Sequence, residues 1–231
     1  MFNFKSALVV VAHPDDEVLG CGGTIAKMIQ FGVDVRILFL ADGVYSRGMN
    51  HNSVLIDELS QRRTSALNAC KILGTQSLFF GDFQDNEMDK YSLLTITQKV
   101  EKEIEDFQPD AIFTHHIGDV NIDHQLTHKA VVTACRPQKN CSVKSIFTFE
   151  ILSNTEWQFA SNNLSFAPSY FVDISSTLNL KISALEQYSF EMREWPHPRS
   201  IRGAQVLANF RGSCIGTDAA EAFMVGRIII K

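Results

Sequence analysis

Short, wholly apolar runs recur through the first two thirds of the chain, and each is followed by a stretch with helical periodicity. Such runs predict strands that are buried on both faces, as in parallel sheets. Strands that alternate with helices form βαβ units, which restrict the chain to an α/β fold with a mostly parallel sheet. The expected strands are Ala7–Val11, Val35–Leu40, Leu78–Phe80, Ala111–Thr114 and Ser145–Phe149, and the expected helices are Thr24–Phe31, Asp57–Leu73, Leu93–Phe107 and about His124 to Cys135.

The pattern loosens after about residue 150. Two short strands are expected at Tyr170–Ile174 and Met224–Ile230, and one helix is expected at Leu178–Glu194. The sequence shows no repeat, low-complexity stretch or linker that would mark a second domain. We therefore predict a single domain over residues 1–231, a Rossmann-like three-layer α/β sandwich with a C-terminal elaboration.

Composition excludes several classes of partner. The chain is 45% hydrophobic and 20% charged, which suits a globular protein with a sizeable core. Its formal net charge of −5 gives no support to binding of nucleic acid or anionic membranes. Five cysteines, an odd number without a C-x-x-C pair, indicate reduced thiols and a cytoplasmic protein. The apolar run at residues 7–12 is too short for a signal peptide or membrane span, so no integral anchor is expected.

A first polar cluster, AHPDDE at residues 12–17, follows the first strand directly. In an open α/β sheet, ligands bind beyond the carboxyl ends of the strands. Pro14 favours a turn in which His13 and Asp16 converge on one atom, as two ligands of a zinc-like ion would. Taken alone, the cluster could equally be a polar turn whose aspartates cap the next helix.

A second cluster, THHIGDVNIDH at residues 114–124, follows the fourth strand. Two strand-end loops at one sheet edge can face each other across a crevice. A third ligand from this cluster would complete a set of two histidines and one carboxylate, which leaves a position open as catalytic zinc sites do. Asp15, a carboxylate beside the ion, would then accept a proton from water. The candidates in this cluster are His115, His116, Asp119, Asn121, Asp123 and His124.

These residues resemble the LmbE/PIG-L deacetylases. The resemblance rests on AHPDDE, the later Asp-His, GDFQDNEMD (81–89), PHPRS (196–200) and FRGSCIG…AEAF (210–223), and it covers nearly the whole chain. It implies zinc-dependent removal of an acyl group, usually acetyl, from the amide nitrogen of a small amino sugar. Carried over by position, His13, Asp16 and His124 would bind one Zn²⁺ per chain, or another divalent transition metal, and Asp15 would be the general base.

The chain departs from the family at Asn121, where many members have a histidine that stabilises the oxyanion or protonates the amine. His116 is therefore our candidate for the general acid, with His115 second. We expect Asp119 or Asp123 to orient His116. Asn121 would still be able to donate a hydrogen bond to an oxyanion.

Further residues have both a functional and a structural interpretation. Arg62 would reach a sugar or phosphate oxygen, or lie on a solvated helix face. Asp85 would accept sugar hydroxyls, or belong to a turn. The rigid segment with His197 and Arg199 would close over the site and contribute to specificity. Two carboxylates would support ligands from behind: Asp123, and Glu221, which would hold a ligand or Arg211 unless it forms a plain salt bridge. The glycines of GCGG (20–23) would let backbone and substrate approach closely.

Three other functions compete with an N-acetyl sugar deacetylase. An amidase acting on a sugar–thiol conjugate would use the same residues. A sugar-binding protein that merely retained the metal would not need the base Asp15. A dinucleotide-dependent oxidoreductase is disfavoured, because GCGG lacks the G-x-G-x-x-G spacing. The aromatic residues near the C-terminal third would suit either a homo-oligomer interface or the core.

Overall fold

The computed structural model describes residues 2–41, 52–159 and 165–230, and its centre is a seven-stranded sheet with the order β3-β2-β1-β4-β5-β7-β6. β1 to β5 run parallel, whereas β7 is antiparallel to both of its neighbours. The prediction of an α/β fold with a mostly parallel sheet is confirmed. The strands are β1 (Ser6–Val11), β2 (Asp34–Ala41), β3 (Leu78–Phe83), β4 (Ala111–His115), β5 (Ser145–Phe149), β6 (Tyr170–Asp173) and β7 (Ala220–Ile228).

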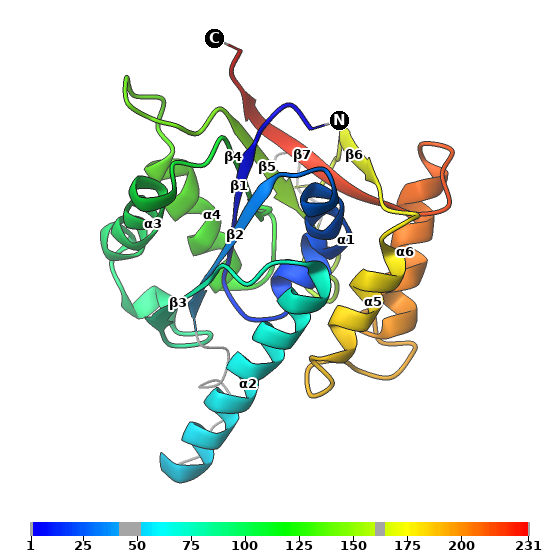
Figure 1. The fold of residues 1–231 in the computed structure, drawn as a ribbon. Helices are drawn as coiled ribbons and strands as arrows, with labels where there is room; N and C mark the ends of the chain where they lie inside the picture. The colour runs from blue at the N-terminus through cyan, green and yellow to red at the C-terminus, as the bar shows by residue number, and fades with distance from the viewer. Residues whose placement is uncertain (1, 42–51, 160–164, 231) are drawn as a thin grey trace.

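Helices cover both faces of the sheet and give it three layers (Figure 1). α3 and α4 pack together on one face, and α5 contacts α1, α2 and α6 on the other. None of the described helices is both long and apolar enough to cross a membrane. The helices are α1 (Asp16–Gln30), α2 (Asn52–Leu73), α3 (Leu93–Phe107), α4 (Ile122–Ala134), α5 (Leu178–Glu186) and α6 (Ile201–Ser213), with a short 3₁₀ helix η2 (Met88–Lys90).

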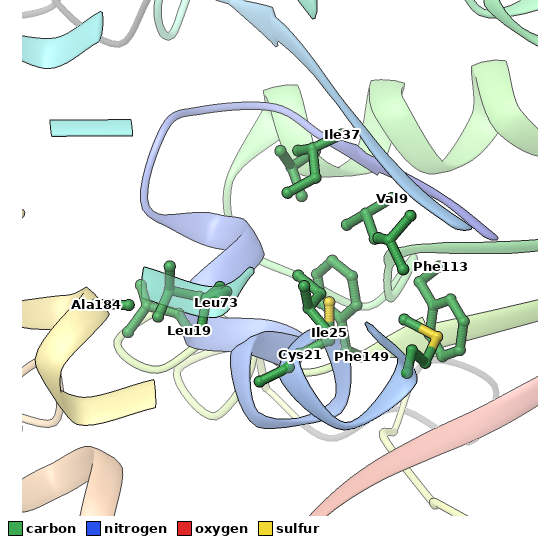
Figure 2. Close-up of a cluster of buried hydrophobic side chains, with 14 of the residues drawn as sticks. Val9, Leu19, Cys21, Ile25, Ile37, Leu73, Phe113, Phe149 and Ala184 are labelled. Atoms are coloured by element: carbon green, nitrogen blue, oxygen red, sulfur yellow. The ribbon is translucent and has the colours of Figure 1, made fainter. Parts of the chain in front are cut away.

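Alternate residues of the central strand β1 enter two separate cores. Val9 packs in the core under α1, α2, α5 and α6, whereas Leu8 and Val10 pack in the core under α3 and α4. Figure 2 shows the first core, where Val9, Phe113 and Phe149 of the sheet face the side chains of α1. Burial on both faces is the reason why these strands appear in the sequence as continuous apolar runs.

α1 begins at Asp16, and the prediction of a start at Thr24 is wrong. The helix is kinked at Cys21, whose φ of −150° and ψ of 25° are not helical. The Glu221 carboxylate accepts hydrogen bonds from the N–H groups of Gly23 and Thr24, at 3.0 and 2.7 Å, just beyond the kink. The predicted helix therefore corresponds to the second segment of α1. The glycine run lies inside the helix, where it allows close packing against core side chains.

The C-terminal third differs most from the prediction. The sequence pattern does not indicate α6, because Gly203 and Gly212 interrupt its helix-forming residues. Gly203 is required by packing, since a Cβ there would lie 2.0 Å from the Pro198 carbonyl oxygen. α5 ends at Glu186 and not at Glu194. The remaining shifts lie at element ends, where β7 covers 220–228, α2 begins at 52, α4 begins at 122 and β3 continues to 83.

The strand order places both polar clusters at one sheet edge. β1 lies between β2 and β4, so the chain leaves β1 on one side and later returns on the other. Such a topological switch point is where ligands bind in open α/β sheets. β1 and β4 pair in parallel with Val10 opposite Thr114. Their carboxyl ends, and the loops that follow, therefore lie next to each other.

Gly20→Ala is expected to lower the free energy of unfolding by about 1–3 kcal/mol, as overpacking of a dense core does. The added methyl group would lie 2.4 Å from the fully buried ring of Phe149. Urea unfolding followed by far-UV circular dichroism measures the loss. Gly226→Ala is the control, because a Cβ there would lie at an ordinary 3.5 Å from Ile146. Equal losses in the two variants would contradict the packing argument.

Candidate active site

The turn after β1 depends on Pro14 and on an unusual backbone at Asp15. Pro14 fixes its own φ and favours an extended conformation at His13. Asp15 has a φ of 122°, a conformation that side chains with a Cβ rarely adopt. The backbone N–H of His13 donates to Asp16 Oδ2 at 2.9 Å and closes the turn. His13, Asp15 and Asp16 are all buried as a result.

His13, Asp16 and His124 come together as a set of residues that could hold a metal ion, with one ligand atom of each within 4.8 Å of the others. Asp16 Oδ2 lies 3.4 Å from His13 Nδ1 and 3.3 Å from His124 Nε2. Asp16 Oδ1 and both ring nitrogens of His124 are buried without a well-directed hydrogen bond. Because buried polar atoms seldom remain unsatisfied, this donor set fits a cation.

Two carboxylates support His13 from the other side of its ring. Nε2 lies 2.9 Å from Asp123 Oδ2 and 3.0 Å from Asp85 Oδ1. Asp123 is itself held by the backbone N–H groups of Asn86 and Met88. With Nε2 engaged in this way, Nδ1 is the nitrogen that faces Asp16, which is the arrangement of metal-binding histidines that have a carboxylate behind them.

Asp119 supports His124 in the same manner. Its Oδ2 lies 3.0 Å from His124 Nδ1 and accepts a hydrogen bond from Thr155 Oγ1 at 3.0 Å. The ring of His115 stacks on His124 with centroids 3.9 Å apart. His115 Nε2 accepts from the Ala12 N–H at 2.9 Å, so this ring is held by the backbone of the first loop.

The electrostatics of the cluster suit a cation. Burial alone would raise the pKa of Asp16, but His124 and His115 outweigh it and hold that pKa well below its usual value. Burial alone would lower the pKa of His124, but Asp16 and Asp119 raise it to about 9. The carboxylates of Asp16 and Asp119 thus favour positive charge at this point of the site. A divalent cation held by these residues would supply such a charge.

Asp15 directly precedes Asp16 in the chain, and its carboxylate is held by Arg199. Arg199 Nη1 donates to Asp15 Oδ2 at 2.8 Å. Among the described residues, no hydrogen bond reaches the second oxygen, Oδ1. Burial raises the pKa of Asp15 to about 6 against the opposing charge of Arg199. The carboxyl group can therefore exchange a proton near neutral pH.

Glu17 holds Asp15 from beneath. Its Oε2 accepts from the Asp15 backbone N–H at 3.0 Å, and its Oε1 accepts from the Tyr188 hydroxyl at 2.6 Å. Burial raises the pKa of Glu17 to about 8, although both hydrogen bonds oppose the shift. These bonds tie the unusual backbone of Asp15 to the segment that follows α5.

The predicted orientation of His116 is wrong. Asp119 and Asp123, expected to orient it, instead contact His124 and His13. His116 is buried, its backbone N–H donates to the Phe149 carbonyl, and its ring centroid lies 5.4 Å from that of Phe166.

Asn121 forms the N-cap of α4. Its side-chain oxygen accepts from the Asp123 N–H at 2.8 Å, and its Nδ2 donates to Asn86 Oδ1 at 3.0 Å. The amide that replaces the expected histidine is thus engaged in capping and in joining two loops. Helix capping by Asn121 also places Asp123 and His124 in the first turn of α4.

The remaining predicted residues lie around the cluster at different distances. Arg62 Nη1 lies 3.4 Å from the Pro14 carbonyl oxygen and 2.8 Å from Glu191 Oε1. His197 packs its ring against Trp157. Glu221 contacts Lys181 at 2.6 Å and not Arg211, which pairs with Glu150 at 2.6 Å. Of the alternatives expected for Glu221, the structure shows the plain salt bridge, here with Lys181, and not a contact with Arg211. Glu221 also caps the second segment of α1.

Three comparisons relate the chain to known proteins. The family model described as "PIG-L: GlcNAc-PI de-N-acetylase" matches residues 8–135, more than half of the chain. The chain belongs to the PIG-L family. Diacetylchitobiose deacetylase of Thermococcus kodakarensis is 29% identical over 205 residues, 82% of this chain and 71% of that one. The structure of N,N'-diacetylchitobiose deacetylase from Pyrococcus horikoshii superposes with a TM-score of 0.79 at 22% identity, covering 97% of this chain and 85% of that one.

Membership of the PIG-L family confirms the resemblance seen in the sequence and places the chain in a family of hydrolytic enzymes. A relative named for another reaction is equally similar. 4-Oxalmesaconate hydratase of Pseudomonas putida is 28% identical over 228 residues, 89% of this chain and 82% of that one. The reaction of this PIG-L family member therefore has to be argued from its own site.

Proposed function

We propose that the protein is a zinc-dependent hydrolase that removes the N-acetyl group of a small amino sugar or sugar conjugate. One observation carries the proposal. A buried carboxylate, Asp15, directly precedes Asp16 of a His-Asp-His donor set whose buried atoms include several without a well-directed hydrogen bond, at the switch point of the sheet. A binding protein would need no base at this position, whereas hydrolysis of an amide requires one.

The donor set suits zinc better than the hard cations. Two imidazole nitrogens and one carboxylate match the three protein ligands of catalytic zinc sites, whereas magnesium and calcium prefer oxygen. His13, Asp16 and His124 would hold the ion, with Asp123, Asp85 and Asp119 behind them. When bound, zinc would polarise the amide carbonyl and acidify a water molecule.

Asp15 would move the protons of the reaction. Oδ1 forms no hydrogen bond among the described residues and would accept a proton from the attacking water. The oxygen of that water would add to the amide carbon. When the carbon–nitrogen bond breaks, the leaving nitrogen needs one proton. Asp15 would return the proton it has taken, or His116 would supply its own. The products are the free amine and acetic acid, which ionises to acetate. If His116 supplies the proton, Asp15 loses the proton of the water to solvent and His116 takes one up from solvent, so each turnover consumes one water.

Residues around the proposed metal ligands would bind the substrate. Arg62 contacts the Pro14 carbonyl oxygen in the turn after β1, and we propose that it reaches a sugar or anionic oxygen. His197 projects from the segment between α5 and α6 and packs against Trp157, where it would contribute to specificity. Asp85 contacts His13 at 3.0 Å, so we propose that it supports the metal site as well as accepting sugar hydroxyls.

His116→Ala separates the two proton donors. If His116 protonates the amine, the variant should keep its metal and lose or shift the alkaline limb of its rate profile, with turnover lowered about 10²–10⁴-fold. His128→Ala is the matched control, because His128 lies on α4 with its Nδ1 against the His115 carbonyl oxygen. Unchanged turnover and an unchanged alkaline limb in His116→Ala would leave Asp15 as the proton donor.

The decisive experiment combines metal analysis with product detection. The purified protein should contain about one zinc per chain and release acetate from at least one member of a panel of N-acetylated mono- and disaccharides and sugar conjugates. Release of a longer acyl group, or of a carboxylic acid that carries a thiol, would favour the amidase that acts on a sugar–thiol conjugate. Metal without any amide cleavage, together with hydration of 4-oxalmesaconate, the compound named for one relative, would replace the proposal with a hydratase.

A further inference from the structure

Arg199 uses all three of its guanidinium nitrogens within the chain. Nη1 donates to Asp15 Oδ2 at 2.8 Å, and Nε donates to Ser153 Oγ at 3.1 Å. Asn154, with its amide oxygen turned toward Arg199, accepts from Nη2 at 3.1 Å. A guanidinium fork that is bound at three points has one orientation. Arg199 therefore presents a fixed donor to the carboxylate of the base.

The segment that carries Arg199 is itself held firmly. The Arg199 backbone carbonyl accepts from the Arg193 N–H at 2.8 Å, and its N–H donates to His197 Nδ1 at 3.1 Å. Ser200 caps α6 by accepting from the Gly203 N–H at 2.9 Å. Gly203 also lets α6 approach the Pro198 carbonyl closely. The position of the guanidinium is thus fixed by the start of a helix.

The turn at 151–156 contacts residues that support both Asp15 and His124. Ser153, which holds Arg199, has a φ of 66°, a left-handed conformation that is costly for a residue other than glycine. Its backbone N–H donates to Glu156 Oε1 at 2.6 Å. Thr155 of the same turn donates to Asp119, which lies against the ring of His124. One turn therefore fixes the proposed base through Arg199 and a proposed metal ligand through Asp119.

We propose that Arg199 is a positioning residue that orients the Asp15 carboxylate, and that it does not bind substrate. This inference rests on the proposed function, because it assigns Arg199 a role through the base. Asp15 is only 2% exposed, so the orientation of its carboxylate is decided by protein contacts. Arg199 occupies Oδ2 and leaves Oδ1 for the water. A misplaced base loses rate, and a displacement of about 1 Å can cost about 10²-fold.

A double-mutant cycle tests the role. Arg199→Ala alone should lower kcat about 10–100-fold with KM nearly unchanged, because orientation is lost and substrate contacts remain. In the Asp15→Asn background the same substitution should cost nothing further, because the group it positions no longer acts as a base. Ser153→Ala, a milder change, should give a smaller loss of kcat with the same pattern. Arg202→Ala, which removes an arginine stacked 4.6 Å from the Trp195 ring, should leave both constants unchanged.

A crystal structure of Arg199→Ala gives a readout that needs no activity. The Asp15 carboxylate should rotate or occupy several orientations, while zinc content stays at the parent value. An unmoved Asp15, or a rise in KM that is equal in the parent and Asp15→Asn backgrounds, would overturn the inference and make Arg199 a substrate ligand. If the parent protein cleaves no amide, the proposed function fails, and the position of Asp15 in the variant still decides the role of Arg199.

Discussion

His13→Ala is expected to reduce zinc content from about one per chain to nearly none while the domain stays folded. His13 supplies one of three donors, and its ring separates Asp16 from the carboxylates of Asp85 and Asp123. The remaining His124 and Asp16 give only two ligands, too few for a tight zinc site. Elemental analysis after dialysis measures the loss directly. Parent zinc content in His13→Ala would refute the assignment.

Thermal unfolding provides the second readout for the metal. A ligand that binds only the native state stabilises it by about 2.7 kcal/mol at a concentration one hundred times its Kd. The parent protein should therefore gain in Tm when zinc is added, and His13→Ala should gain almost nothing. His128→Ala, a half-buried histidine of the same domain, should respond as the parent does. A similar gain in all three proteins would mean that zinc binds elsewhere.

The parallel half of the fold is largely accessible from sequence because its strands β1, β4 and β5 are almost wholly buried on both faces. Residues 7–11 of β1 alternate between two cores, so this run contains no polar residue and stands out as a strand. The sequence indicates only the second part of α1, residues 24–31, because a run of glycines is unfavourable inside a helix. Here Gly20 and Gly23 sit inside the helix to let Phe149 and Ile174 pack against it. Only the tertiary contact shows that these glycines serve packing.

Part of the candidate site can also be predicted from the sequence, and part cannot. The three proposed metal ligands follow strand ends, and the parallel pairing of β1 with β4 places those ends side by side. Which carboxylate supports which histidine could not be predicted, since Asp119 and Asp123 lie close together in the sequence. The start of α4 between them leaves Asp119 in the loop and puts Asp123 in the first helical turn, and this decides which histidine each one contacts. The contact between Arg199 and Asp15 joins residues far apart in the chain. It depends on α6, which the sequence pattern did not reveal.

Asp15→Asn is expected to keep its zinc and lose most turnover, about 10²–10⁴-fold, which is the usual contribution of general acid–base catalysis. The substitution preserves shape. The asparagine oxygen can still accept from Arg199, and the backbone N–H can still donate to Glu17. What disappears is the ability to take a proton. Asp110→Asn, which removes a carboxylate paired with Lys144 at 2.9 Å, is the control for the change in charge.

The pH profile of the parent protein links this loss to Asp15. Burial raises the pKa of Asp15 to about 6, and a bound divalent cation beside it would favour the ionised form and lower that pKa. The base is active only when deprotonated, so kcat/KM should fall as pH decreases through a value at or below about 6. The residual rate of Asp15→Asn should lack this acid limb. Loss of zinc together with activity would make Asp15 a metal ligand, and full activity in Asp15→Asn would remove it from the mechanism.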